Sequence, residues 1–171
     1  SGSTGHPLVL WLGRERVSHD VAAKWRATRW WGVDIGDPEV VIWASPIETG
    51  AQDRVRQFRD RMLRSNFIDA RDLSEDRVPA MLAEIERANP RMLFGYASAM
   101  ARIANFATRR GARFRCDRLK VIFVTAAKLL DQQRAQISTF FGAPVADGYG
   151  GRDAGFIAHE CPHGTRHLTE E

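Results

Sequence analysis

The first five residues, "SGSTG", place two serines, a threonine and two glycines ahead of His6 and Pro7. Small residues let consecutive backbone N–H groups converge on an anion, and the hydroxyl groups of Ser1, Ser3 and Thr4 add further donors. This is the chemistry of a phosphate-binding loop. The standard nucleotide loop pattern, G-x-x-x-x-G-K-[ST], is absent. A plain tail is the alternative interpretation of this stretch.

A second glycine-rich stretch, "DGYGGRDAG", covers residues 147–155. A tyrosine on a glycine turn at a strand end exposes a flat ring, so Tyr149 could stack on a purine. Asp153 could hold Mg²⁺ or accept charge-assisted hydrogen bonds. The alternative is a surface turn in which the glycines only provide positive φ angles.

A third stretch, "HECPHGTRH" (159–167), contains side chains that bind zinc in other proteins. The candidate ligands are His159, Cys161, His163 and His167. Their spacing fits no standard zinc finger. A polar loop with one buried cysteine is the alternative.

Segments of strand and helix type must position these stretches, and they alternate along the chain. Apolar or extended segments lie at 8–12, 39–45, 66–70, 91–95, 119–125, 143–150 and 155–161. Helical patterns lie at 18–32, 50–64, 74–90, 97–111 and 131–142, with Ser18 and Ser74 as candidate N-caps. The five tryptophans are expected in the core. This alternation predicts an α/β fold in three layers, with a mostly parallel sheet flanked by helices.

Ligands of such sheets bind beyond the carboxyl ends of the strands. The loop after 119–125 and the stretch "DGYGGRDAG" after 143–147 both occupy that position in the predicted sheet. We therefore expect the two loops to form one site.

Composition narrows the class of protein. The chain has 171 residues, 44% of them hydrophobic and 27% charged, which suits a single globular domain. No apolar stretch is long enough to span a membrane. Two cysteines favour a reducing cytoplasm over a disulfide framework. The net charge is +4, but Asp53 and Asp60 are interspersed among the arginines at 53–64, and the basic stretch 109–118 lies at a helix end, so nucleic-acid binding is not expected.

"SGSTGHPL" followed by "APVADGYGGRDAGFIAHEC" resembles the adenylate-forming acyl- and aryl-CoA ligase superfamily, especially its phenylacetate–CoA ligase branch and the capsular-polysaccharide-biosynthesis relatives. The middle of the chain, 93–107 and 119–145, looks similar as well, whereas 14–90 agrees only in layout. The resemblance implies a two-step reaction. ATP activates a carboxylic acid as an acyl-adenylate, and coenzyme A or a carrier thiol then displaces AMP.

The resemblance also implies roles for individual residues. Ser1, Gly2, Ser3, Thr4 and Gly5 would hold the β- and γ-phosphates. The adenine site would comprise Ala126, Ala127, Lys128, Asp147, Gly148, Tyr149, Gly150 and Gly151. Thr4, Arg152 and Asp153 would take part in catalysis, with Asp153 as the Mg²⁺ ligand. Zn²⁺ at 159–167 is a further candidate, because some relatives carry Cys and His there.

Several positions depart from the family pattern. Asp153 replaces a glutamate, Arg152 replaces a serine or threonine, and Lys128 stands where a glutamate is usual. Family members are about three times longer, so we expect residues 1–171 to be one α/β domain truncated at both ends and inactive in isolation. Exposed sheet edges could support a homo-oligomer. A non-catalytic nucleotide-binding or assembly module and a zinc-stabilised interaction domain remain the alternatives.

Overall fold

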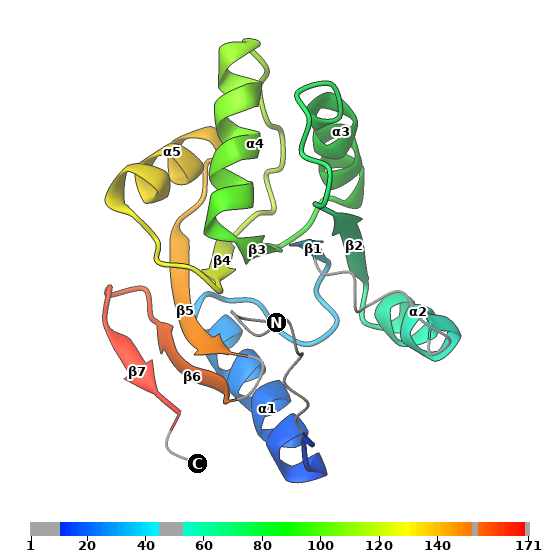
Figure 1. The fold of residues 1–171 in the computed structure, drawn as a ribbon, viewed down its shortest axis with the longest axis vertical. Helices are drawn as coiled ribbons and strands as arrows, with labels where there is room; N and C mark the ends of the chain where they lie inside the picture. The colour runs from blue at the N-terminus through cyan, green and yellow to red at the C-terminus, as the bar shows by residue number, and fades with distance from the viewer. Residues whose placement is uncertain (1–10, 45–52, 152–153, 170–171) are drawn as a thin grey trace, which may run out of the picture.

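The computed structural model describes residues 11–44, 53–151 and 154–169 (Figure 1). Helices and strands alternate along most of this sequence, as predicted. The helices are α1 (Arg14–Trp30), α2 (Asp53–Met62), α3 (Val78–Ala88), α4 (Ala97–Arg109) and α5 (Asp131–Phe141). The strands are β1 (Glu39–Trp43), β2 (Ser65–Asp69), β3 (Met92–Tyr96), β4 (Val121–Thr125), β5 (Val145–Gly151), β6 (Gly155–Glu160) and β7 (Arg166–Leu168).

Within the described residues, the strands form one seven-stranded sheet in the order β2-β1-β3-β4-β5-β6-β7. The first five strands pair in parallel, and β6 and β7 extend the sheet in antiparallel fashion. A parallel sheet needs cover on both faces, which explains why every residue of β4 is buried. The predicted α/β class with a mostly parallel sheet is confirmed.

Two hydrophobic clusters hold the helices to the sheet. The larger cluster packs β1, β3, β4 and β5 against α3, α4 and α5, and it includes Ile42, Leu93 and Val124. The smaller cluster joins α1 to residues such as Met92 and Phe123. Because neighbouring strand residues point to opposite faces, α1 covers one face and α3, α4 and α5 cover the other. In Figure 1, α1 accordingly lies on the opposite side of the strands from α4 and α5.

The two predicted helix caps are wrong. Helix α1 begins at Arg14 after Gly13, so Ser18 lies inside the helix. Helix α3 begins at Val78, four residues after Ser74. Pro79 therefore stands in its first turn, where the missing N–H costs no helical hydrogen bond, and it does not bend the helix interior.

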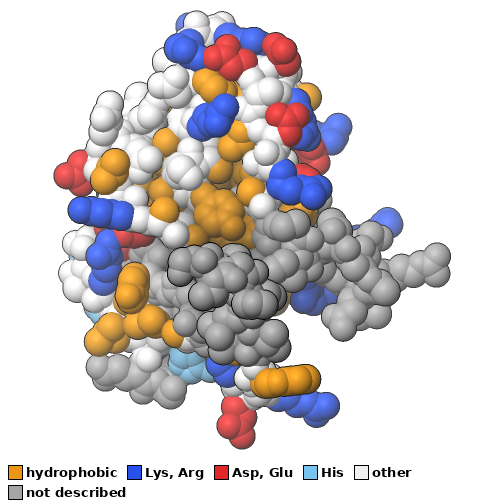
Figure 2. Space-filling model, in the orientation of Figure 1, with side chains coloured by type: hydrophobic (Ala, Val, Ile, Leu, Met, Phe, Trp, Pro, Cys, Tyr) orange, Lys and Arg blue, Asp and Glu red, His pale blue; other side chains and the backbone are white. Residues whose placement is uncertain are grey.

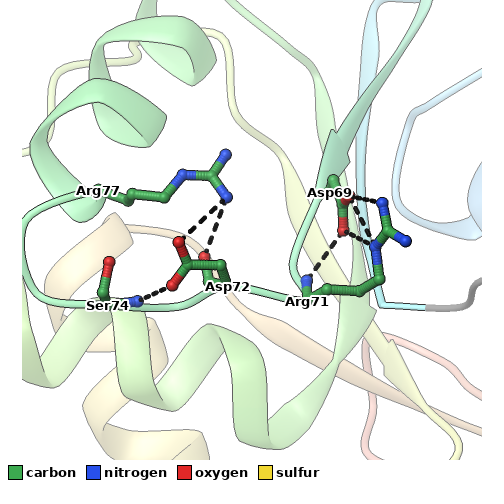
Figure 3. A network of polar contacts seen from close by, with 5 residues as sticks. All are labelled: Asp69, Arg71, Asp72, Ser74 and Arg77. Carbon is green, nitrogen blue, oxygen red and sulfur yellow. Dashed lines mark hydrogen bonds and ion pairs between the residues drawn. The ribbon is translucent and has the colours of Figure 1, made fainter.

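A polar turn occupies the connection between β2 and α3 instead of a helical cap (Figure 3). The backbone N–H of Ser74 donates to Oδ1 of Asp72 at 3.0 Å, and Arg77 donates to the carbonyl of Asp72 at 3.3 Å. At the end of β2, Arg71 binds the Asp69 carboxylate with both its guanidinium and its backbone N–H. These hydrogen bonds lower the pKa of Asp69 to about 2.

The tryptophans and the first strand also differ from expectation. Trp11 is 96% exposed, and the other four tryptophans are only partly buried. Residues 11–12 of the predicted first strand are not in a strand, and residues 8–10 lie outside the described residues.

Arginines at the end of α4 are paired with acids from the turn before α3. Arg109 forms an ion pair with Glu75, and Arg110 pairs with Asp76 at 3.1 Å. Figure 2 shows Lys and Arg side chains interspersed with Asp and Glu side chains at this end of the molecule. No helix among the described residues combines the length and the apolar character that crossing a membrane requires.

Gly95 gives a direct test of the sheet packing. A Cβ atom there would lie 2.5 Å from the backbone oxygen of Ile42 and 3.1 Å from Cε of Met100. Gly95→Ala should therefore lower the free energy of unfolding by about 1–3 kcal/mol, because the clash is with backbone of the neighbouring strand. Urea denaturation measures this change. Gly13→Ala is the control, since no atom lies within 4 Å of its added Cβ; equal losses in the two variants would contradict the packing.

Candidate functional site

Two cavities lie at the carboxyl ends of the parallel strands. The first, here called the glycine cavity, has a volume of about 480 Å³. The second, called the aromatic cavity because Trp43, Phe94, Tyr96 and Phe156 line it, has a volume of about 520 Å³. The glycine cavity is lined by Ala126, Ala127, Lys128, Leu129, Asp147, Gly148, Tyr149, Gly150 and Arg166. Ala126 and Gly150 line both cavities, so the two spaces meet at these residues.

One wall of the glycine cavity is the loop between β4 and α5. The loop begins at Ala126, whose φ of 69° lies in the left-handed region that residues with a Cβ rarely adopt. Leu129 anchors the loop in the larger hydrophobic cluster, and Gln133 accepts the backbone N–H of Leu130 at 3.2 Å. Lys128 is exposed and has no hydrogen-bond or ion-pair partner among the residues that the structure describes. Its ammonium group is therefore available to a ligand.

The facing wall is β5. Tyr149 lies within this strand and not on a turn, which corrects the prediction for this stretch. Its partner in β6 is Ala158, and the register shifts between Tyr149 and Gly150. A β-bulge of this kind redirects side chains, and the Tyr149 side chain is 62% exposed at the cavity. The Tyr149 ring is exposed, as predicted, but it projects from a strand and not from a turn.

Glycine is required where β5 meets β6. A Cβ on Gly150 would lie 2.2 Å from the carbonyl oxygen of Gly155. Gly155 has a φ of 75°, and a Cβ there would lie 2.0 Å from Oδ1 of Asp20. Asp20 of α1 accepts the backbone N–H of Phe156 at 3.0 Å and pairs with Arg16 at 2.7 Å. The close contacts hold the β5–β6 hairpin against α1.

Rings from three strands line the aromatic cavity. Trp43 of β1 stacks on Tyr96 of β3, with ring centroids 4.1 Å apart, and Phe94 lies 5.9 Å from Trp43. Phe156 of β6 meets Phe94 edge to face at 6.3 Å. The remaining lining residues are Leu12, Arg16, Asp20, Val41, Thr125, Ala126, Gly150, Gly151 and Gly155. This cavity suits an apolar or flat group.

A charged row borders the glycine cavity, and of its four members the sequence predicts only Asp147. Oε2 of Glu160 accepts the backbone N–H of Asp147 at 2.8 Å and a guanidinium N–H of Arg134 at 2.8 Å. Arg166 donates to the carboxylate of Asp147. Two arginines balance two largely buried acids, which removes the cost of an unpaired buried charge. Only the pairing of β5, β6 and β7 reveals this row.

The structure brings most of the predicted adenine-site residues together. Ala126, Ala127, Lys128, Asp147, Gly148, Tyr149 and Gly150 line the glycine cavity. Gly151 lines the aromatic cavity. The predicted phosphate loop, Ser1 to Gly5, and the predicted catalytic pair, Arg152 and Asp153, lie outside the described residues.

The predicted zinc ligands do not form a metal site. Among the described residues, no three His, Cys, Asp or Glu side chains are grouped so as to hold a metal ion. The ring of His159 packs against Phe156 with centroids 4.8 Å apart, and the ring of His167 packs against Trp30 at 5.1 Å. Cys161 is buried after β6, whereas His163 is exposed. The two paired strands use these histidines for packing.

His159 is buried and uncharged. Burial, and to a smaller extent the positive charge of Arg26, lowers the pKa of His159 from 6.5 to about 4. The ring also lies 6.4 Å from the ring of Phe123. Its apolar surroundings favour the neutral form.

Comparison with known proteins identifies the fold. No protein-family model matches the chain, and no curated protein matches it in sequence. The structure is similar to 2-hydroxyisobutyryl-CoA ligase in complex with 2-HIB-AMP and CoA in the thioesterification state, with a TM-score of 0.67 and 18% identity over 96% of this chain and 35% of that chain. It is also similar to ATP-bound MatB from Rhodopseudomonas palustris, with a TM-score of 0.52 and 18% identity over 88% of this chain and 28% of that chain.

The shared fold is that of part of an acyl-CoA ligase. The chain spans about a third of the length of these structures. An open form of the same 2-hydroxyisobutyryl-CoA ligase matches with a TM-score of 0.64 at 16% identity. The fold therefore agrees with the one that the resemblance to adenylate-forming ligases implies. The phenylacetate–CoA ligase branch remains a prediction.

His159 should make stability depend on pH. Below pH 6.5 the unfolded chain protonates this histidine, while the folded chain keeps it neutral until about pH 4. The contribution of His159 to the free energy of unfolding is therefore fully present above pH 6.5. It falls as the pH decreases towards 4, by on the order of 3 kcal/mol in total. Urea denaturation between pH 7 and pH 4.5 measures the slope. His159→Gln should flatten it, and the exposed His163→Gln should not; identical slopes in all three proteins would contradict the assignment.

Proposed function

We propose that the chain is the nucleotide-site portion of an acid–thiol ligase that activates a carboxylic acid with ATP. One observation supports this most strongly: two cavities of different character meet at Ala126 and Gly150. A ligation needs two substrates whose reacting atoms touch, and adjoining cavities would hold them in that arrangement. The fold shared with acyl-CoA ligases supports the same proposal.

The glycine cavity would hold the nucleotide. Tyr149 offers an exposed ring for a purine, and the neighbouring Gly148 and Gly150 also line the cavity. Arg166 is balanced by Asp147 at this cavity, so Lys128 contributes the positive charge that favours an anionic ligand. Ser1 to Gly5, which lie outside the described residues, would bind the β- and γ-phosphates.

The aromatic cavity would hold the acid. Trp43, Phe94 and Tyr96 form its apolar wall, and its junction with the glycine cavity at Ala126 would present the carboxylate to the α-phosphate. A carboxylate oxygen would bond to the α-phosphorus as the bond to pyrophosphate breaks. A thiol, coenzyme A or a carrier, would then take the acyl group and release AMP. Arg152 would neutralise phosphate charge during the first step, and Asp153 would hold a Mg²⁺ ion whose positive charge does the same.

Replacing Tyr149 tests whether the nucleotide binds in the glycine cavity. Tyr149→Ala should weaken ATP binding by roughly 1–3 kcal/mol, the range for stacking of a base on an aromatic ring. That corresponds to roughly five- to 150-fold in Kd. We expect the chain alone to bind ATP weakly, so NMR titration, which detects millimolar binding, is the suitable measurement. Tyr96→Ala is the matched control, because Tyr96 lines only the aromatic cavity.

The control also separates the two cavities. Tyr96→Ala should leave ATP binding unchanged and weaken binding of the acid. An unchanged Kd for ATP in Tyr149→Ala would remove the purine from the glycine cavity.

The phosphate loop tests whether the protein is an enzyme. In the full-length protein, Ser3→Ala combined with Thr4→Ala should slow ATP–pyrophosphate exchange by about a hundredfold or more, since each hydroxyl bond to a charged phosphate contributes roughly 1.5–3 kcal/mol. Lys128, which cannot accept a hydrogen bond where a glutamate is usual, favours the second candidate, a non-catalytic nucleotide-binding module. ATP binding without any exchange, for every carboxylic acid tried, would favour that candidate.

A further inference from the structure

We propose that Glu160 and Arg134 are positioning residues, which hold Asp147, Gly148 and Tyr149 in the conformation that binds the nucleotide. The inference rests on the proposed function for its ligand. Neither Glu160 nor Arg134 lines the glycine cavity. Both would act through the strand that does.

Strand β5 changes its pairing partner in the middle of the site. Its parallel pairing with β4 ends at Asp147, opposite Val124. Its antiparallel pairing with β6 begins at the next residue, Gly148, opposite His159. A strand is weakest where one ladder stops and another starts, because hydrogen bonds there are not continued by the neighbouring backbone.

A side chain takes the hydrogen bond at this point. Glu160 is the residue of β6 that follows His159, so it lies beside Asp147, and its carboxylate accepts the Asp147 N–H at 2.8 Å. The side chain of Glu160 is 11% exposed. A buried carboxylate bonded to a backbone N–H makes a charge-assisted bond, which is shorter and stronger than a neutral one. Glu160 therefore binds the backbone at the residue where β5 changes its partner.

Arg134 fixes Glu160 in turn. Its guanidinium donates to Oε2 of Glu160 at 2.8 Å and to the backbone carbonyl of Val145. Arg134 comes from α5, the helix that follows the loop 126–130. It therefore ties the two walls of the glycine cavity to each other, since Val145 begins β5 and α5 carries the end of the loop.

The third strand completes the row. Arg166 of β7 pairs in register with Glu160, and its side chain binds the carboxylate of Asp147. Asp147 is thus held at its backbone by Glu160 and at its side chain by Arg166. Fixing Asp147 also limits the movement of the adjacent residues, Gly148 and Tyr149.

Variants at Glu160 distinguish positioning from ordinary stabilisation. Glu160→Ala removes the acceptor, whereas Glu160→Gln keeps an amide oxygen that can accept the Asp147 N–H. The matched control is Glu39→Ala. Glu39 of β1 is a similarly buried acid, and Lys24 of α1 pairs with it at 2.8 Å. It lines neither cavity. Both alanine variants should lower Tm.

Two readouts on these variants test the inference. Without nucleotide, Glu160→Ala should speed amide hydrogen exchange at 147–150 by roughly tenfold or more relative to Glu39→Ala of similar global stability. In NMR titration with ATP, Glu160→Ala should raise Kd by roughly tenfold. Glu39→Ala should leave Kd unchanged, and Glu160→Gln should recover most of the wild-type affinity. Arg134→Ala, at a less buried position, should act in the same direction and serves if Glu160→Ala does not fold.

Each remaining outcome decides a claim. Equal amide exchange at 147–150 in Glu160→Ala and Glu39→Ala would overturn the inference, and so would equal Kd values for ATP in those two variants. A wild-type protein that binds no ATP would overturn both the proposed function and the ligand of this inference. A wild-type protein that binds ATP, with no difference between the variants, would overturn only the positioning role.

Discussion

The hydrogen bond from the backbone of Asp147 to the carboxylate of Glu160 lies at the point on which the site depends. At this residue β5 leaves its parallel partner and takes an antiparallel one. The exchange lets one short strand belong to the buried sheet at its first half and to a glycine-rich hairpin at its second half. Both cavities use the second half: Gly150 lines both, Tyr149 lines one and Gly151 lines the other.

The hairpin imposes its own constraint on the sequence. A Cβ atom on Gly150 would overlap the carbonyl oxygen of Gly155, and a Cβ atom on Gly155 would overlap the side chain of Asp20. Asp20 then occupies the space beside Gly155 and binds the hairpin backbone. The first helix is consequently part of the site, although nothing in its own sequence pattern indicates more than a surface helix with an apolar side.

Sequence reasoning predicted the architecture because apolar runs such as "LKVIFVT" and their alternation with helical segments are local signals. It also predicted that the loop 126–128 and residues 147–150 lie together, since both follow parallel strands in one sheet. The row of Arg134, Glu160 and Arg166 could not be predicted in the same way. It depends on the register of two antiparallel strands, one of which has only three residues, all of them exposed. The surroundings of the candidate zinc ligands could not be predicted for the same reason, because the register turns His159 and His167 towards aromatic rings.

A crystal structure with a non-hydrolysable acyl-adenylate analogue bound would show directly which group each cavity holds. We expect the purine to lie against Tyr149 in the glycine cavity and the acyl group to enter the aromatic cavity, with the linkage between them beside Ala126 and Gly150. A purine bound in the aromatic cavity, or an analogue bound away from both cavities, would contradict this arrangement.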